Sequence, residues 1–557
     1  MMRNLLTLGA LTAAALAAQT GITNASVSGM VKDKITGQPL ANYTVSTSVN
    51  VTWVGDTVLQ NSSTKDVTSA TGSSGRYKLM DLPPGSYRIA ASEAQHFGEQ
   101  ITRRVVVNGS DLENIDLLVL VDGTITGKVV DENKEPVPDV AVMLVSREYY
   151  LGNVGYYYNL AGGRTNDLGA YTLARVRPGQ PYLLMVEKQE RTLPAHSEVP
   201  LDPKLRKRVP VRTWYPNSPF KDSAQTSILR PGEKREGVDI ELKKSPSYCV
   251  EGTAAGPMGA ATLRFGIEAM QPSSGISGSG GNFRATPGGL TAADGQFRIC
   301  GLYPGTYRLS AQDADRNPQG APNYGITEIT VVDRDLEGVR VTAVAGKPLE
   351  VEVAWDGEPP ASPAANKVAV SLTPLYRTSF PNERSGARSD IPGTFTLDGV
   401  FPDDYGVRAF INAPGIYVKD VTFSGRSVLY EPLHAGAAMS GAGMRVIMAH
   451  DGATLNVQVN DKDGNPGADL RVLAIPADVP SEGAMQARLV QGQTNQAGQF
   501  TSQTVPPGKY YVVATEETVD ATPESIGRLW RSRIRYKEVD LPPAGSAQVK
   551  LEPGKIE

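Results

Sequence analysis

Short stretches of alternating hydrophobic and polar residues recur along the chain from Val27 onward and predict β-strands. Examples are Ser86–Ala91, Asn114–Leu120 and Gly338–Ala343. Turn-forming Gly, Pro, Asn and Asp residues separate these stretches at intervals of roughly 8 to 12 residues, which is typical of β-sandwiches. Outside the first residues no segment has a convincing helical period, so we expect an all-β protein.

The chain also contains an internal repeat with two landmarks. The first is Gly-x-aromatic, which begins at Gly75, Gly169, Gly295, Gly393 and Gly498. The second is a proline turn followed by Tyr, which begins about 10 residues later at Pro84, Pro178, Pro304, Pro402 and Pro507. A glycine with positive φ before one strand and a Pro-Gly turn after it predict a β-hairpin. In the fourth repeat Asp403 replaces the turn glycine, and we expect it to adopt the left-handed conformation that Asp tolerates.

These landmarks divide the 557 residues into a tandem array of about five transthyretin-like or immunoglobulin-like β-sandwich modules. The predicted boundaries are a signal peptide at 1–18, followed by modules at 19–120, 121–245, 246–346, 347–450 and 451–557. Module 2 contains a Tyr-rich hairpin, module 3 a Gly/Ser loop around 273–281, and module 4 diverges most from the shared pattern.

The N-terminus has the features of a secretory signal peptide. Arg3 precedes the apolar run Leu5–Ala18, and Ala15-Leu-Ala17 provides small residues for cleavage near Ala17 to Gln19. The run is too short to span a bilayer of about 30 Å as a helix. We expect a protein that is exported to the periplasm, cell surface or medium and does not span the membrane. A buried apolar helix is the alternative.

The order of the motifs resembles that of carboxypeptidase regulatory-like domains. It is clearest in Gly127–Pro136, Asn166–Tyr171 and Pro178-Gly179, and repeats one, two and five follow it best. The resemblance implies a transthyretin-type sandwich, grouped with carbohydrate-binding-like folds, in an extracytoplasmic setting. Such modules serve as stabilising, spacing or binding units, and the resemblance implies no reaction.

Charge and cysteine content narrow the choice of partner. The net charge is −4, which provides no basic field for nucleic acid. The basic run Lys204–Arg208 is interpreted as a solvated strand edge, although an acidic polymer is an alternative. Cys249 and Cys300 lie in apparent strands of one module, so an oxidising compartment predicts a disulfide between them, with two buried thiols as the alternative.

Clustered aromatic residues are the candidate ligand-binding surface. They are Tyr149, Tyr150, Tyr156, Tyr157, Tyr158 and Trp214, and the tyrosines surround an expected Gly-Asn turn. Aromatic rings with a polar tip suit stacking on sugars or packing against a protein. Alternatively, alternate tyrosines face the core of the module and Trp214 fills the gap between two modules.

Candidates for catalysis and metal binding are weak. His96, Glu99 and His196 resemble a zinc ligand set, but no catalytic domain fits between them. Asp461–Asn465 resembles the start of a calcium loop without its final Glu, and suits a hairpin turn equally well. We predict no catalytic residue, metal or cofactor. The sequence favours a non-enzymatic extracytoplasmic scaffold that binds a cell-surface or periplasmic protein, and the alternative is a polysaccharide-binding protein.

Overall fold

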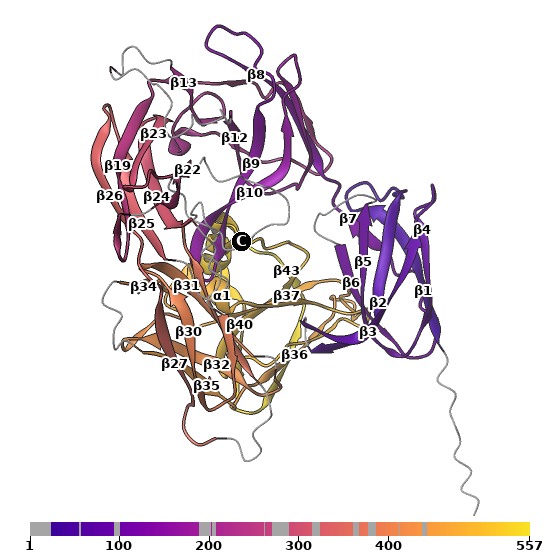
Figure 1. Cartoon of the computed structure of the whole chain (residues 1–557). Helices are drawn as coiled ribbons and strands as arrows, with labels where there is room; N and C mark the ends of the chain where they lie inside the picture. Colours follow the sequence, from indigo (N-terminus) through magenta and orange to yellow (C-terminus); the bar gives the residue numbers. More distant parts are fainter. Residues whose placement is uncertain are drawn as a thin grey trace, which may run out of the picture. The chain divides into compact units, whose positions relative to one another are not determined.

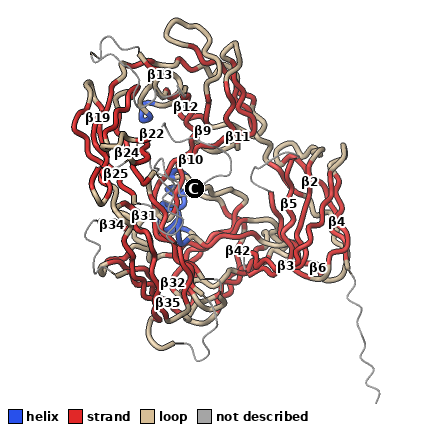
Figure 2. The backbone as a smooth tube through the Cα atoms, viewed as in Figure 1, coloured by secondary structure: helices blue, strands red, loops and turns tan. Residues whose placement is uncertain are grey.

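The computed structural model describes residues 24–54, 57–93, 101–188, 202, 208–260, 262–269, 289–314, 323–359, 367–376, 386–411, 413–436 and 443–557 (Figure 1). The predicted signal peptide lies outside these residues. The chain forms two compact units. The first unit comprises the described residues up to 118, except 33–36 and 53–58. Those two segments belong to the second unit, together with the described residues from 119 to 557. Strands predominate throughout the described chain, which confirms the all-β fold class (Figure 2).

Module 1 contains two sheets, ordered β4-β1-β7 and β3-β2-β5-β6. Val27, Leu79 and Ile89 contribute fully buried side chains to its core. Its strands are β1 Ala25–Asp33, β2 Tyr43–Val54, β3 Thr57–Ala70, β4 Arg76–Leu82, β5 Gly85–Glu93, β6 Ile101–Val107 and β7 Leu117–Val119.

Modules 2 and 3 begin the second unit, and each buries one core between its two main sheets. In module 2 the sheets are β10-β9-β12-β14 and β11-β8-β16. Its elements are β8 Gly123–Val130, β9 Ala141–Tyr150, β10 Asn153–Arg164, β11 Ala170–Val176, β12 Tyr182–Glu187, β13 Val209–Pro210, β14 Thr213–Trp214, η2 Lys221–Ser223, β15 Thr226–Ser227, β16 Lys234–Arg235, β17 Ile240–Glu241 and β18 Lys244–Ser245. Those of module 3 are β19 Tyr248–Gly256, β20 Gly259–Ala260, β21 Leu263–Ala269, β22 Gly289–Leu290, β23 Gln296–Leu302, β24 Gly305–Asp313, β25 Tyr324–Val331 and β26 Leu336–Thr342.

Module 4 pairs its opening strand with its last strand in parallel, in the sheet β30-β27-β35-β32-β33. The second sheet is β29-β28-β31-β34. The strands are β27 Lys347–Trp355, β28 Val368–Pro374, β29 Gly386–Ser389, β30 Gly393–Val400, β31 Asp403–Phe410, β32 Tyr417–Phe423, β33 Arg426–Ser427, β34 Leu433–Ala435 and β35 Met444–Ala449.

Module 5 has the sheets β39-β36-β42 and β38-β37-β40-β41. Its strands are β36 Thr454–Val459, β37 Arg471–Pro476, β38 Val490–Gln493, β39 Gln499–Thr501, β40 Gly508–Thr515, β41 Lys537–Leu541, β42 Ser546–Leu551 and β43 Pro553–Gly554. Unlike the sequence-based expectation, it also contains α1 (Glu482–Arg488), α2 (Pro523–Ser532) and the short η3 (Arg533–Arg535). The two α-helices cover the outer face of β37 and β40, where Leu473, Ile475 and Val513 are buried against them.

The tyrosine of the second landmark has a repeated hydrogen bond. In four modules its hydroxyl donates to the carbonyl oxygen four residues earlier, at 2.7 Å in Tyr87, 2.7 Å in Tyr307, 3.2 Å in Tyr405 and 2.9 Å in Tyr510. In module 2 an extra residue separates turn and tyrosine, and Tyr182 donates to the side chain of Gln180 instead. The landmark thus ties the start of one core strand to the turn before it.

Asp403 does not adopt the left-handed conformation predicted for it. The corresponding Gly85 and Gly305 have no positive φ either, whereas Gly179 (80°) and Gly508 (132°) do, so this turn position accommodates both conformations. Asp403 begins β31 with a buried side chain. Its replacement of glycine therefore needs another explanation, which the contacts between modules supply.

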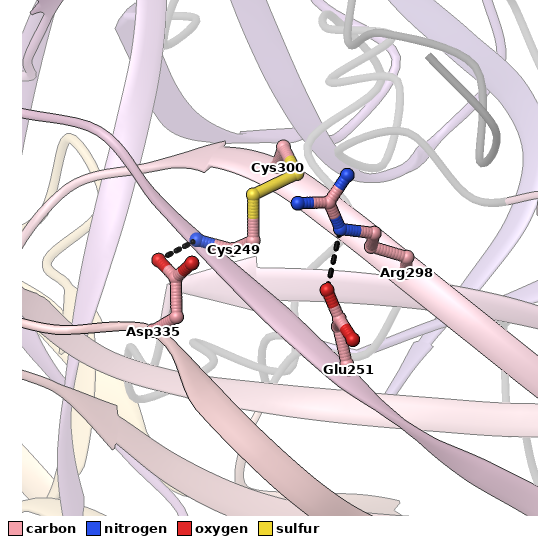
Figure 3. The surroundings of a disulfide bond; sticks show 5 residues. All are labelled: Cys249, Glu251, Arg298, Cys300 and Asp335. Atoms are coloured by element: carbon pink, nitrogen blue, oxygen red, sulfur yellow. Dashed lines mark hydrogen bonds and ion pairs between the residues drawn. A yellow bond between two sulfur atoms is a disulfide. The ribbon is translucent and has the colours of Figure 1, made fainter. Parts of the chain in front are cut away.

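A disulfide joins Cys249 of β19 to Cys300 of β23 (Figure 3). The backbone register shifts between Tyr248 and Val250, so Cys249 lies at an irregularity in the pairing. Asp335 accepts a 2.9 Å hydrogen bond from the Cys249 amide, and Arg298 pairs with Glu251 across the same two strands (Figure 3). The opening strand of module 3 is thereby held on both sides.

Candidate functional site

The Tyr-rich segment of module 2 forms the hairpin β9–β10, in which Tyr150 pairs with Asn153. Its turn residues are Leu151 and Gly152, both with positive φ, as a two-residue hairpin turn requires. The turn therefore precedes the expected Gly-Asn pair by one residue. The backbones of Tyr156, Tyr157 and Tyr158 pair with β9, but their side chains lie outside the described part of the structure.

Tyr149 contacts module 5. Its amide donates to the carbonyl oxygen of Ala521 at 2.7 Å, and its hydroxyl donates to the carboxylate of Glu482 in α1 at 3.3 Å. The ring packs against the hydrophobic cluster beneath α1 and α2. Burial, followed by the Glu482 carboxylate, raises the pKa of Tyr149. This predicted ligand-binding residue therefore lies in a contact within the chain.

The hairpin turn contacts both module 4 and module 5. A Cβ added to Gly152 would lie 2.7 Å from the carbonyl oxygen of Tyr430, and one added to Gly483 would lie 2.0 Å from the carbonyl oxygen of Gly152. Side chains at either position would separate the backbones. We call the meeting point of Tyr149, Gly152, Tyr430, Glu482 and Gly483 the hairpin junction.

An ion pair reinforces the junction. Arg177 of module 2 lies 3.1 Å from Asp520 of module 5, and both side chains are at most about a third exposed. Burial raises the pKa of Glu148 on β9, while the hydroxyl of Ser146 donates to its carboxylate at 2.9 Å. Modules 2 and 5 thus share apolar, hydrogen-bonded and ionic contacts although more than 300 residues separate them.

Trp214 is only 4% exposed and packs with Met143, Val145 and Met185 on the outer face of the β9–β12 sheet. Contrary to the prediction, its ring cannot contribute to an exposed ligand surface. The hydrophobic residues in its cluster all belong to module 2. Burial raises the pKa of the neighbouring module's Tyr303, which lies beside Arg212 and Glu187 of module 2.

Modules 3 and 4 share a buried ion pair. Arg308 of β24 lies 2.9 Å from Asp403 of β31, and the two side chains are 4% and 0% exposed. The Arg308 guanidinium also lies 4.8 Å from the centre of the Tyr376 ring. Tyr324 and Phe401 pack edge to face next to it, with ring centres 5.1 Å apart. The aspartate that replaces the turn glycine in repeat four is therefore an intermodule ligand of Arg308.

Modules 4 and 5 are joined by a 2.8 Å hydrogen bond from the Gly415 amide to the hydroxyl of Thr504. Beside it lies a cleft of about 550 Å³. Module 4 lines the cleft with residues 417–419 and Tyr430, and module 5 with Asp478, Phe500 and residues 487–491 and 503–507. No sequence signal marked this cleft, because its two walls are distant along the chain.

The other predicted chemistry is not assembled in the described residues. His96, Glu99 and His196 lie outside them. Asp461 uses its carboxylate within the turn, where it accepts from the amides of Asp463 at 2.9 Å and Asn465 at 2.8 Å. From the basic run only Arg208 is described, and it pairs with Glu132. Among the residues searched no group of three or more His, Cys, Asp or Glu side chains could hold a metal ion. No described helix has the length and apolarity to cross a membrane.

Comparison with known families decides the identity of the first module. Residues 26–119 match the carboxypeptidase regulatory-like domain family. This confirms the resemblance to the carboxypeptidase regulatory-like domain in repeat one, and modules 2–5 have the same all-β fold class. No curated protein matches the chain.

Solved structures with partial similarity include bacterial pilins. The TIE protein of Bacillus anthracis is 13% identical with a TM-score of 0.16, and the match covers 57% of this chain and 51% of that one. A streptococcal ancillary pilin is 13% identical with a TM-score of 0.18, over 57% of this chain and 99% of the pilin. A minor pilin of Streptococcus agalactiae is 15% identical with a TM-score of 0.23, over 40% and 97%.

Proposed function

We propose that the protein is an exported, non-enzymatic scaffold whose modules 2–5 hold one another in a fixed arrangement and present surfaces to proteins of the cell envelope or cell surface. The observation that carries the proposal is the hairpin junction. Contacts run from module 3 to 4 through Arg308, from 4 to 5 through Gly415, and from 5 back to 2 through Tyr149. Modules joined only by linkers would lack the last of these contacts.

Three further observations support this function. The landmark tyrosines are used inside the sandwiches, where they bond backbone carbonyls. The disulfide suits an oxidising compartment. The carboxypeptidase regulatory-like match in module 1 is to a domain that accompanies other domains rather than to a catalytic one.

The test combines cell fractionation, N-terminal sequencing and cross-linking in cells. We expect a mature chain that begins near Gln19, found outside the cytoplasm and cross-linked to a reproducible set of envelope or surface proteins. Tyr149→Ala, which opens the hairpin junction, is expected to reduce these cross-links, while Gln499→Ala, at an exposed position of β39, serves as the control. A cytoplasmic, unprocessed chain would contradict the proposal.

Carbohydrate binding through the other tyrosines is a second proposal. Tyr150 is half-buried, and its hydroxyl makes no hydrogen bond within the described part of the chain. A tyrosine ring with a polar hydroxyl suits contact with a sugar. Co-sedimentation with insoluble polysaccharides and peptidoglycan tests it, with the wild type compared to a variant in which Tyr150 and Tyr156–Tyr158 are replaced by Ala. Equal sedimentation of both proteins would reject this site.

A further inference from the structure

We propose that the cleft between modules 4 and 5 binds an extended, uncharged segment of a partner polypeptide, which adds as a strand to the edge of β38. The inference rests on the proposed scaffold function and specifies how one of its partners is held.

The lining of the cleft shows which part of each sheet faces it. Three runs of consecutive residues line it: 417–419 in β32, 487–491 from the end of α1 into β38, and 503–507 in the turn before β40. Side chains in a strand alternate between the two faces of its sheet, so a cleft over a face would meet every second residue. Contact with consecutive residues of β32, and with Val490 and Gln491 of β38, means that the cleft runs along strand edges. At an edge the main-chain N–H and C=O groups point outward.

Both edges lack a neighbouring strand within the described part of the chain. β38 ends its sheet and pairs only with β37. β32 pairs with β35 on one side, while on the other β33 reaches only Thr422 and Phe423. The register also shifts at Lys419, which leaves this residue without a partner in β35. Open edges of this kind accept an additional strand. The bulge and Lys419 discourage addition at β32, which leaves β38 as the accepting edge.

The side chains around the cleft favour an uncharged occupant. Its two cationic groups already have partners within the chain, because Lys419 pairs with Asp356 and Arg488 lies 3.1 Å from Asp478. A charged segment would therefore lose water without gaining an unpaired counter-charge. The half-buried Tyr417 and Tyr430 and the prolines Pro506 and Pro507 offer apolar contacts for alternate side chains of the added strand. The volume lies within the range of about 300–1,000 Å³ that is typical of ligand sites.

The test begins with a phage-displayed library of twelve-residue peptides selected on the mature full chain. An enriched peptide is then synthesised and its affinity measured by fluorescence anisotropy. Gln491→Lys places a lysine on the exposed edge of β38, where lysine discourages strand addition. Gln499→Lys introduces the same charge at an exposed position of β39 that does not line the cleft. Circular dichroism establishes that both variants are folded.

We expect the selection to enrich uncharged peptides with alternating apolar residues. These peptides should bind the Gln499→Lys variant with the affinity of the wild type. They should bind the Gln491→Lys variant at least tenfold more weakly. N-methylation of alternate amides along one edge of the peptide is expected to abolish binding, since it removes main-chain donors and leaves the side chains. Binding should also slow hydrogen exchange of the β38 amides.

Three results would overturn the inference: no enriched peptide, equal binding to both lysine variants, or binding that tolerates N-methylation on either edge. Displacement of the peptide by a soluble neutral polysaccharide would reassign the cleft to sugars and would also overturn it. If cross-links to surface proteins persist in Gln491→Lys, the scaffold function stands and only this site is wrong. A chain that is not exported and forms no such cross-links would instead reject the function itself.

Discussion

At the scale of single residues, the hydrogen bond of the landmark tyrosine recurs in four modules of the described chain. Tyr510 is 1% exposed, and its hydroxyl bonds the Pro506 carbonyl in the turn before β40. Deleting only the hydroxyl leaves the ring in the core and removes one hydrogen bond.

Tyr510→Phe is therefore expected to lower the free energy of unfolding by about 0.5–1.5 kcal/mol, the usual net value of one such bond. Urea denaturation at neutral pH measures it. Tyr150→Phe is the control, because that hydroxyl makes no hydrogen bond with the described residues, and an equal loss in both variants would mean that the bond to Pro506 contributes nothing.

Buried tyrosines also make the stability depend on alkaline pH. Burial raises the pKa of Tyr510 and that of Tyr430 to about 12, whereas a tyrosine in the unfolded chain ionises near 10. Between these values the unfolded chain releases protons that the folded chain retains, so stability falls as pH rises. We expect the free energy of unfolding to be constant up to about pH 9 and to decline from pH 10 to 12. Ultraviolet titration of tyrosinate against unfolding curves at each pH tests this, and full ionisation of all tyrosines near pH 10 would contradict it.

At the scale of elements, the sequence could predict the sandwiches because their strands and turns are local patterns. The hairpin of each module follows from two landmarks about 10 residues apart. The helices were missed because α1 has only 7 residues and α2 has 10, too few for a clear period. Signals for their starts were nevertheless present, since Ser481 and Thr522 cap them and Pro523 follows Thr522.

The hairpin β9–β10 illustrates what local patterns cannot provide. Its tyrosines suggested an exposed surface, but the partners of Tyr149 lie on α1 and before α2, more than 300 residues away. A single sequence does not indicate that these distant segments lie close together in the fold. The pattern predicted a contact with a ligand or partner, whereas the contact that Tyr149 makes lies within the chain.

Tyr149→Ala is expected to weaken the attachment of α1 and α2. The variant loses the hydroxyl bond to Glu482 and the ring's contact with the cluster beneath the helices, a cost of about 1.5–3 kcal/mol for a well-buried ring and less for this half-buried one. Hydrogen exchange of the amides in α2 should accelerate roughly tenfold, because 1.4 kcal/mol corresponds to that factor. Tyr150→Ala should leave the rates unchanged, and identical exchange in both variants would show that the junction does not hold the helices.

At the scale of the whole molecule, a residue that departs from the repeat pattern forms a contact between modules. Asp403 is the clearest case, because a glycine would satisfy the turn but could not pair with Arg308. Asp403→Gly is thus expected to destabilise the second unit by about 3 kcal/mol, since it leaves a buried arginine without its closest partner. The double variant Asp403→Gly with Arg308→Met should recover most of this loss, and chemical denaturation of the two variants measures it. A double variant as unstable as the single one would mean that the turn, rather than the ion pair, requires Asp403.

The division into two compact units predicts how the full chain unfolds. Contacts that link modules 2 to 5 make their unfolding cooperative, whereas module 1 has its own core and unit. Calorimetry of the mature chain should therefore show two transitions, and the larger should correspond to modules 2–5. Asp403→Gly and Tyr149→Ala should lower the midpoint of the larger transition alone, although one change lies between modules 3 and 4 and the other between modules 2 and 5. If each variant instead showed a separate unfolding transition for the modules next to the substitution, the contacts would be too weak to couple the modules. The proposal of a fixed arrangement would then be wrong.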